Sequence, residues 1–262
     1  MTALSVRNLT KSFGGRPVVR DVSFDLNAGE VLGLVGESGS GKSTIARCVA
    51  RLTKPDSGQI RLGDADLLGA SRRGLRTLRR DVQMVFQDPY SSLNPRMTAG
   101  ALIEEGLLVH GIERDRRARR ERAVALLETV GLSAPDAVRH PRSFSGGQRQ
   151  RIAIARALAV EPKVLICDEV VSSLDVSVQA QVLDLFLDLR ERLDLSILFI
   201  AHDLAVVHYL CDRVAVLDQG RLVEIGARKQ IYGDPVHPYT RSLLAAVPVP
   251  DPAAERARQA AS

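Results

Sequence analysis

The sequence of 262 residues is poor in cysteine and in aromatic side chains, and it contains no long apolar run. Its three cysteines, Cys48, Cys167 and Cys211, are far apart and form no CxxC pair. We therefore expect neither a disulfide framework nor a zinc ribbon, but reduced and mostly buried thiols in a cytoplasmic protein. No apolar run approaches the roughly 18 residues that a membrane-spanning helix needs. The first eleven residues lack an apolar signal core, so secretion is not expected either.

The scarcity of aromatic residues, 4% of the chain, decides how its positive charge is interpreted. There are 36 Lys and Arg against 31 Asp and Glu, a formal charge of +5, and arginines gather at residues 72–80 and 114–122. A surface for nucleic acid would interleave aromatic side chains with the arginines for base stacking, and neither cluster contains one. We interpret the clusters as solvated helix faces, leave contact with anionic lipid open, and expect no nucleic-acid partner.

What is present is an ordinary globular composition, 45% hydrophobic and 26% charged, which excludes disordered and collagen-like chains. Strand and helix patterns alternate, and such alternation with apolar strands predicts an α/β fold with a mostly parallel sheet covered on both faces. Residues 5–13 and 18–26 are expected to be N-terminal antiparallel strands around a Gly-Gly-Arg-Pro turn. The further expected strands are 30–35, 59–62, 82–86, 164–167, 197–201 and 214–217, and the expected helices are 42–52, 176–193 and 205–210.

Two parts of the chain differ from this alternation. Between about residues 95 and 160 the apolar pattern is helical, which predicts a helical subdomain inserted between two parts of the core, about 1–94 and 161–232. After Gly233 the chain is rich in proline, so 233–262 is expected to be an extended or loosely packed tail. The length predicts that these parts form a single domain over 1–262.

The strongest motif is GESGSGKS at residues 36–43, which fits the pattern G-x-x-x-x-G-K-[ST] in full. An apolar strand precedes it and an amphipathic helix follows, as a phosphate-binding loop requires. Its glycines allow backbone N–H groups to point at phosphates, Lys42 would lie against the β- and γ-phosphates, and Ser43 would coordinate Mg²⁺. The alternative is a chance Gly/Ser turn. The residues expected to bind nucleotide are Gly36, Ser38, Gly39, Ser40, Gly41, Lys42 and Ser43.

A second motif is the pair of acids that follows the apolar strand 164–167. We expect Asp168 to hold Mg²⁺ through water, and Glu169 to orient and polarise the attacking water. Strands often end in acids, so this interpretation depends on the phosphate loop upstream.

A third motif, Ser-Gly-Gly-Gln at 145–148, opens a predicted helix and offers further backbone N–H groups to an anion. A single chain does not obviously need two phosphate sites. The economical interpretation is that this helix end covers the nucleotide of another chain, and the alternative is an ordinary serine-capped helix.

With these motifs in this order, the chain resembles the nucleotide-binding subunits of ATP-binding cassette (ABC) transporters over nearly its whole length. The resemblance implies an ABC-type P-loop core with an inserted helical subdomain, and ATP hydrolysis with Mg²⁺. It also implies residue roles. The additional nucleotide-site residues are Phe13 (stacking on adenine), Thr44, Gln87, Ser145, Gly146, Gly147, Gln148 and Asp175, the implied catalytic residues are Lys42, Gln87, Glu169 and His202, and the implied metal ligands are Ser43, Gln87 and Asp168.

Two longer runs, residues 86–95 and 234–244, look like those of importers for oligopeptides, dipeptides and nickel. This implies a peripheral subunit at the cytoplasmic face of the cell membrane that energises import. Its implied partners are a second cassette subunit, identical or a sister, two permease subunits and, indirectly, an extracytoplasmic solute-binding protein. Some relatives carry C-terminal cysteines for an iron–sulfur cluster; this tail has none, so no cluster is expected. The alternative is an ATPase accessory to a soluble multi-enzyme complex of the phosphonate carbon–phosphorus lyase type, without a transport role.

Overall fold

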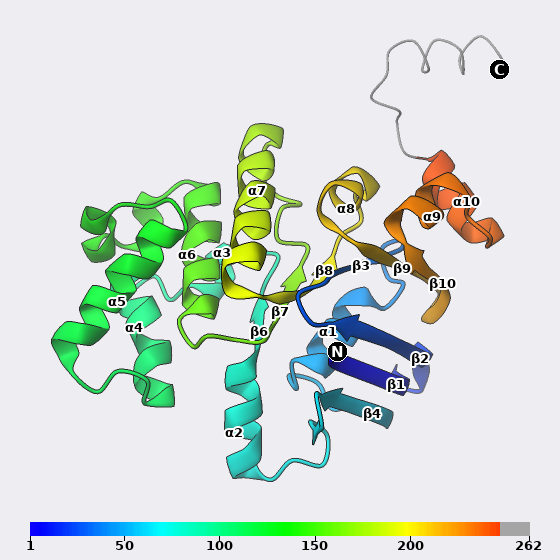
Figure 1. Cartoon of the computed structure of the whole chain (residues 1–262), viewed down its shortest axis with the longest axis horizontal. Coiled ribbons are helices and arrows are strands. Elements are labelled where there is room, and N and C mark those ends of the chain that lie inside the picture. Colours follow the sequence, from blue (N-terminus) through cyan, green and yellow to red (C-terminus); the bar gives the residue numbers. More distant parts are fainter. Residues whose placement is uncertain (247–262) are drawn as a thin grey trace.

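The structure, a computed structural model, describes residues 1–246 (Figure 1). Its strands are β1 (Thr2–Phe13), β2 (Arg16–Asn27), β3 (Val31–Val35), β4 (Ser57–Leu62), β5 (Ala65–Asp66), β6 (Val82–Val85), β7 (Val164–Asp168), β8 (Ser196–Ile200), β9 (Arg213–Asp218) and β10 (Arg221–Ala227). Its helices are α1 (Lys42–Val49), α2 (Arg72–Asp81), α3 (Pro89–Ser92), α4 (Ala99–His110), α5 (Arg116–Thr129), η1 (Ala134–Val138), η2 (Pro141–Ser143), α6 (Gly146–Leu158), α7 (Val176–Leu193), α8 (Leu204–Leu210), α9 (Arg228–Gly233) and α10 (Pro238–Ala245).

The strands form two sheets, as the alternation of patterns predicted. The larger sheet has the order β10-β9-β3-β8-β7-β6, in which β6, β7, β8, β3 and β9 are parallel and β10 is antiparallel to β9. The smaller sheet, β2-β1-β4-β5, is antiparallel and contains the N-terminal hairpin. The expected α/β class, with a mostly parallel sheet and N-terminal antiparallel strands, is confirmed.

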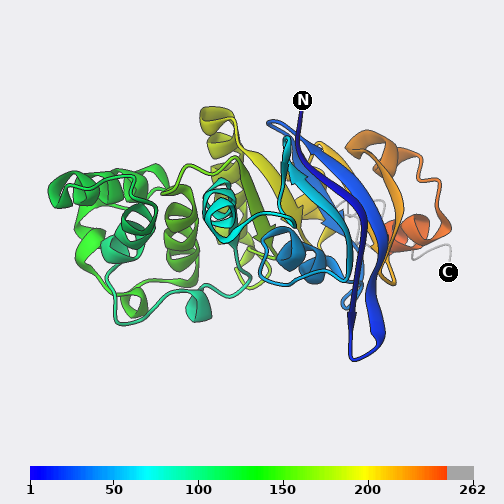
Figure 2. The same ribbon diagram turned by 90° about the horizontal axis from the view of Figure 1, so that it is seen from below.

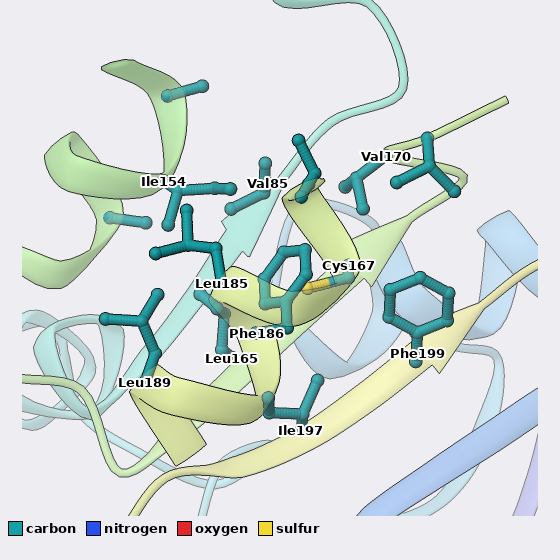
Figure 3. Packing of buried hydrophobic residues seen from close by; sticks show 14 of the residues in the cluster. Val85, Ile154, Leu165, Cys167, Val170, Leu185, Phe186, Leu189, Ile197 and Phe199 are labelled. Carbon is teal, nitrogen blue, oxygen red and sulfur yellow. The ribbon is translucent and has the colours of Figure 1, made fainter. Parts of the chain in front are cut away.

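The parallel strands of the larger sheet are apolar at nearly every position and are mostly buried, as expected for a sheet covered on both faces. In β7, Leu165 and Cys167 point into a cluster formed with the helices, where Phe186 of α7 meets Phe199 of β8 edge to face at 5.9 Å (Figure 3). Val164 and Ile166 point to the other face, which packs against α1 and the antiparallel sheet. This double burial holds the carboxyl ends of the parallel strands in fixed positions.

The stretch that was expected to be helical contains α4, α5 and α6, which lie together at the end of the molecule far from the antiparallel sheet (Figures 1 and 2). Thr98, Asp115 and Ser145 cap the three helices through side-chain oxygens that accept backbone N–H groups. The helical insertion is thus confirmed, while its proposed limits at 95 and 160 stay a prediction. Across residues 1–246, no helix combines the length and the apolarity needed to cross a bilayer.

The tail from Gly233 was expected to be extended or loosely packed, and the residues that the structure describes there are not extended. Residues 238–245 form the helix α10, and Tyr239, Leu243 and Leu244 pack against the main apolar cluster. Proline content suggested a broken chain, but Pro238 lies in the first turn of the helix, where its missing N–H and fixed φ are compatible with helical structure. Residues 247–262, with the remaining prolines of the predicted tail, lie outside the described residues.

Candidate active site

The carboxyl ends of four parallel strands bring most of the predicted site residues to one edge of the larger sheet. β3 leads into the loop 36–41, β7 into Glu169, β8 into His202 and β6 into Gln87. Because β3, β8, β7 and β6 are parallel neighbours, these four segments emerge side by side. This edge is where ligands bind in open parallel α/β sheets.

The phosphate loop needs glycine at two positions where the backbone of other segments lies very close. Gly36 has φ 149°, and a Cβ atom there would lie 2.1 Å from the carbonyl oxygen of Leu217 in β9. Gly41 has φ 105°, and its Cβ would lie 2.7 Å from the carbonyl oxygen of Val18 in β2. The phosphate loop therefore packs closely against the backbone of both β9 and the N-terminal hairpin. These contacts set the path of the loop.

This close packing predicts different losses of stability for two alanine substitutions in the same loop. Gly36→Ala should lower the free energy of unfolding by about 2 kcal/mol or more, because the new methyl group overlaps a backbone carbonyl. Gly39→Ala is the matched control: φ is 81°, but nothing lies within 4 Å of the added Cβ, so a loss of about 1 kcal/mol is expected. Urea unfolding without nucleotide measures the free energy of unfolding of both variants, and equal losses would contradict the close packing at Gly36.

Lys42 is buried inside the loop that it closes. Lys42 is only 4% exposed, and its Nζ atom donates hydrogen bonds to the carbonyl oxygens of Gly36 (2.7 Å) and Glu37 (2.8 Å). Burial lowers the pKa of the ammonium group, and the carboxylates of Glu169 and Asp168 partly oppose that shift. The loop thus holds a desolvated positive charge close to two acids. A polyanion bound at the loop would be stabilised by that charge.

Two of the three residues expected to bind Mg²⁺, Ser43 and Asp168, are in contact with each other. Ser43 Oγ donates a hydrogen bond to Asp168 Oδ1 over 2.8 Å, which joins the start of α1 to the end of β7. Burial raises the pKa of the Asp168 carboxyl, and the nearby charge of Glu169 raises it further. A hydroxyl and a carboxylate are hard oxygen donors of the kind that Mg²⁺ prefers. A bound cation would also stabilise the ionised form of Asp168.

The loop has further features that fit a bound phosphate chain. α1 has no side-chain cap, so the first backbone N–H groups of the helix are left for a ligand. The hydroxyl oxygen of Ser40 is buried and makes no hydrogen bond within residues 1–246. Ser38, Gly39 and Thr44 lie in the same loop and first helical turn. An anion and a magnesium ion therefore both fit the groups that this segment presents.

Two of the other predicted catalytic side chains, those of Gln87 and His202, approach the carboxylate of Glu169. Gln87 Nε2 donates to Glu169 Oε2 over 3.1 Å, and His202 Nδ1 lies 3.7 Å from the same oxygen. Glu169 itself has φ 50°, a left-handed conformation that is uncommon for a residue with a side chain and that concentrates at functional sites. Gln87 also reaches Ser172 Oγ at 3.4 Å, a contact that the sequence pattern did not indicate.

Phe13, the expected adenine platform, lies at the tip of the β1–β2 hairpin and is 51% exposed. Lys11 Nζ lies 5.2 Å from the centre of its ring. The hairpin borders the phosphate loop through Val18 and Gly41. An exposed aromatic face therefore lies on the strand pair that flanks the loop.

The remaining predicted residues form a second group. Ser145 and Gln148 form a capping box at the start of α6, with Ser145 N–H donating to Gln148 Oε1 (3.0 Å) and Gln148 N–H to Ser145 Oγ (3.3 Å). A Cβ on Gly147 would lie 2.2 Å from Val178 of α7, the helix that Asp175 caps. Within residues 1–246, no hydrogen bond joins Ser145–Gln148 or Asp175 to the phosphate loop.

Comparison with known proteins gives independent evidence on the family of the chain. The family model of ABC transporters matches residues 19–172, and that of the oligopeptide/dipeptide transporter C-terminal region matches residues 223–262. A peptide import ATP-binding protein of Brucella ovis is 53% identical over 260 residues, which cover 98% of this chain and 82% of the relative. The oligopeptide transport ATP-binding protein OppF of Bacillus subtilis is 49% identical over 260 residues, with coverages of 97% and 85%.

A solved structure agrees with the fold. A dimeric ATP-binding cassette in a post-hydrolysis state, bound to ADP and phosphate, superimposes with a TM-score of 0.77 at 29% identity and covers 86% of this chain and 98% of its own. The matched family region spans more than half of the chain and contains the phosphate loop, Gln87, Ser145–Gln148 and Glu169. The chain therefore belongs to the ABC transporter family, as an ATP-binding subunit.

Proposed function

We propose that this chain binds and hydrolyses ATP to energise the import of peptides across a membrane. The observation that carries the proposal is the match of residues 223–262 to the C-terminal region of oligopeptide and dipeptide transporters, in a chain that also has a complete phosphate loop. Relatives named for peptide import share about half of their residues with it over nearly its whole length. They favour transport over an accessory role in a soluble multi-enzyme complex.

The chemistry follows from the residues at the sheet edge. Lys42 and the N–H groups of the loop would bind the β- and γ-phosphates, and Ser43, Asp168 and Gln87 would hold Mg²⁺. When bound, Mg²⁺ would neutralise charge that develops on the phosphate oxygens. Glu169 would accept hydrogen bonding from the attacking water and orient it, and His202 would contact the γ-phosphate. Phosphoryl transfer needs such positioning and electrostatic stabilisation more than covalent catalysis.

The second group of residues supports a composite site. Ser145, Gly146, Gly147 and Gln148 begin a capped helix that makes no hydrogen bond to its own phosphate loop among the described residues. We propose that this helix end covers the nucleotide of a second cassette subunit, identical or related, with Asp175 at the contact between them. The likeness to a dimeric cassette supports this arrangement.

A charge placed at that helix end tests the composite site. Ser145→Arg should leave the affinity of one chain for Mg-ATP unchanged within about twofold, since Ser145 does not touch the loop, but it should weaken ATP-driven dimerisation by about tenfold or more through charge and bulk at the contact. Sedimentation of a hydrolysis-deficient chain with ATP measures the dimer, and Ser143→Arg, on the neighbouring 3-10 turn, serves as the control. Unaltered sedimentation of Ser145→Arg would rule out the composite site.

The segment after β6 gives a physical route from the site to a membrane partner. Gln87 contacts Glu169, Tyr90 stacks under the guanidinium of Arg149 at 4.1 Å, and the carbonyl oxygen of Ser92 accepts a hydrogen bond from Arg156 over 2.6 Å. The segment therefore touches both the catalytic acid and the helix α6. We propose that residues 87–97 transmit closure of the site to two permease subunits, with the chain on the cytoplasmic face of the membrane and a solute-binding protein outside.

The test of the transport proposal is the recovery of partners from native membranes. Tagged protein extracted in a mild detergent should retain polytopic membrane proteins and a second cassette subunit, identified by mass spectrometry. Reconstituted with those partners and the binding protein, it should consume ATP faster when a peptide is supplied. Recovery of soluble enzymes alone would contradict the transport role and leave the ATP chemistry intact.

A further inference from the structure

We propose that Tyr239 is a positioning residue for the phosphate loop. Its hydroxyl group, carried by α10 in the C-terminal region, holds the peptide group between Gly36 and Glu37 in the orientation that the loop needs to bind phosphates. The proposal rests on the proposed ATP binding and extends it to a residue 202 positions away in the sequence.

The contact concerns one peptide group with two partners. Its N–H, that of Glu37, donates a hydrogen bond to Tyr239 Oη over 3.1 Å. Its carbonyl oxygen, that of Gly36, accepts a hydrogen bond from Lys42 Nζ over 2.7 Å. In a trans peptide these two atoms point in opposite directions. The peptide plane is therefore held from one side by the lysine of the motif and from the other by α10.

Such a restraint matters because the plane follows a glycine. Gly36 is at φ 149°, a region that other residues rarely adopt, and glycine rotates there at little steric cost. A bound nucleotide would compete for Lys42, and the hydrogen bond from Lys42 to Gly36 would then be exchanged for one to phosphate. The hydrogen bond from Glu37 to Tyr239 does not involve the ligand, so it remains to hold the start of the loop.

The hydroxyl is itself held in place by the fold. The carboxylate of Glu224 in β10 accepts the N–H groups of Val236 (2.9 Å) and His237 (3.0 Å), and His237 Nδ1 accepts the N–H of Tyr239 over 3.2 Å. These bonds fix the start of α10 to the antiparallel edge strand of the larger sheet. Its C-terminal half is fixed by Leu243 and Leu244, which pack on the main apolar cluster. Tyr239 therefore projects from an anchored helix toward the loop.

The hydroxyl has no other hydrogen-bonding partner among the described residues. The ring of Tyr239 packs against the apolar cluster, which phenylalanine would do equally well, but the oxygen bonds to Glu37. Tyr232, in α9, offers the matched comparison. Its hydroxyl donates to the carbonyl oxygen of Leu204 in α8 and, within residues 1–246, makes no hydrogen bond to the phosphate loop. Tyr239 thus joins the C-terminal region to the phosphate loop, and Tyr232 joins it to α8.

The experiment compares Tyr239→Phe with Tyr232→Phe in the full chain. For Tyr239→Phe, the KM for ATP and the Kd for a fluorescent N-methylanthraniloyl ATP with Mg²⁺ should rise about three- to tenfold, the range for one neutral hydrogen bond. The value of kcat should stay within about twofold, because binding of substrate and transition state weakens equally. Tyr232→Phe should leave KM unchanged. Hydrogen exchange of the Glu37 amide should be faster only in Tyr239→Phe.

Each outcome decides the proposal. An unchanged KM in Tyr239→Phe overturns it, as does a similar rise in both variants, which would report general loosening of the C-terminal region. A lower melting temperature with unaltered KM would make Tyr239 a purely structural residue and also overturns it. If the unmodified chain neither binds nor hydrolyses ATP, the proposed function fails. In that case faster exchange of the Glu37 amide in Tyr239→Phe alone still supports the restraint on the loop, and unaltered exchange contradicts it.

Discussion

Replacement of Lys42 by alanine should abolish ATP hydrolysis, with a steady-state rate at least about 10³-fold below that of the unmodified chain. Lys42 is almost completely buried, and its ammonium group is held inside the loop by the carbonyl oxygens of Gly36 and Glu37. In such a desolvated position a positive charge stabilises a phosphate far more strongly than it would in water. Phosphate release at saturating Mg-ATP measures the rate, and fluorescent ATP binding is expected to weaken as well.

Lys163→Ala is the matched control for this substitution. Lys163 precedes β7, at the opposite end of the strand from Asp168, where its exposed side chain forms an ion pair with Asp81 at 3.1 Å. An exposed ion pair contributes little to stability, so hydrolysis and binding should match those of the unmodified chain. Hydrolysis at an unaltered rate in Lys42→Ala would contradict the assigned role of the loop.

Glu169→Gln should reduce hydrolysis by about 10²- to 10⁴-fold while Mg-ATP binding is preserved. Glutamine keeps the size of the side chain but removes the negative charge that would polarise the attacking water. Lys42, Ser43 and Asp168, which would hold the phosphates and Mg²⁺, are unchanged. A single-turnover assay of phosphate release, with fluorescent ATP titration in parallel, separates the chemical step from binding.

Glu161→Gln provides a control with similar local geometry. Glu161 also has a left-handed φ, 55°, and its exposed carboxylate pairs with Arg80 and Arg122 away from the phosphate loop. Its replacement should leave hydrolysis within about twofold of the original rate, because exposed ion pairs contribute little. Steady-state hydrolysis at the original rate in Glu169→Gln would remove Glu169 as the catalytic carboxylate.

The parts of the fold that follow from local pattern could be predicted well. The strands β7 and β8 contain continuous apolar runs, residues 164–167 and 197–200, and every residue of both strands is buried. The helix α7 ends at Leu193, as its periodicity indicated. α10 was missed because proline content was counted without regard to position. The arginine-rich residues 72–80 were expected on a helix face. The bounds of their helix α2, which Ser71 caps, could not be located by periodicity because the helix has too few apolar positions.

The candidate site, like the fold, has features that could be predicted from the sequence and features that could not. The sequence could indicate which residues are expected to carry chemistry, because side-chain types at fixed spacing are a local property of the chain. It could not indicate that Gln87 and His202 both reach Oε2 of Glu169, because that depends on the order of β6, β7 and β8 in the sheet. The left-handed conformation of Glu169 likewise has no signature in the residue itself.

By itself, the sequence determined the phosphate-binding chemistry of this protein and its α/β class, because the spacing of glycine, lysine and hydroxyl residues and the periodicity of apolar residues act over a few positions. Only the tertiary structure decided which distant segments meet. It placed Tyr239 of α10 on the backbone of Glu37, and it left Ser145–Gln148 without a hydrogen bond to the loop among the described residues. Such contacts depend on how sheets and helices pack, and packing is a property of the whole folded chain.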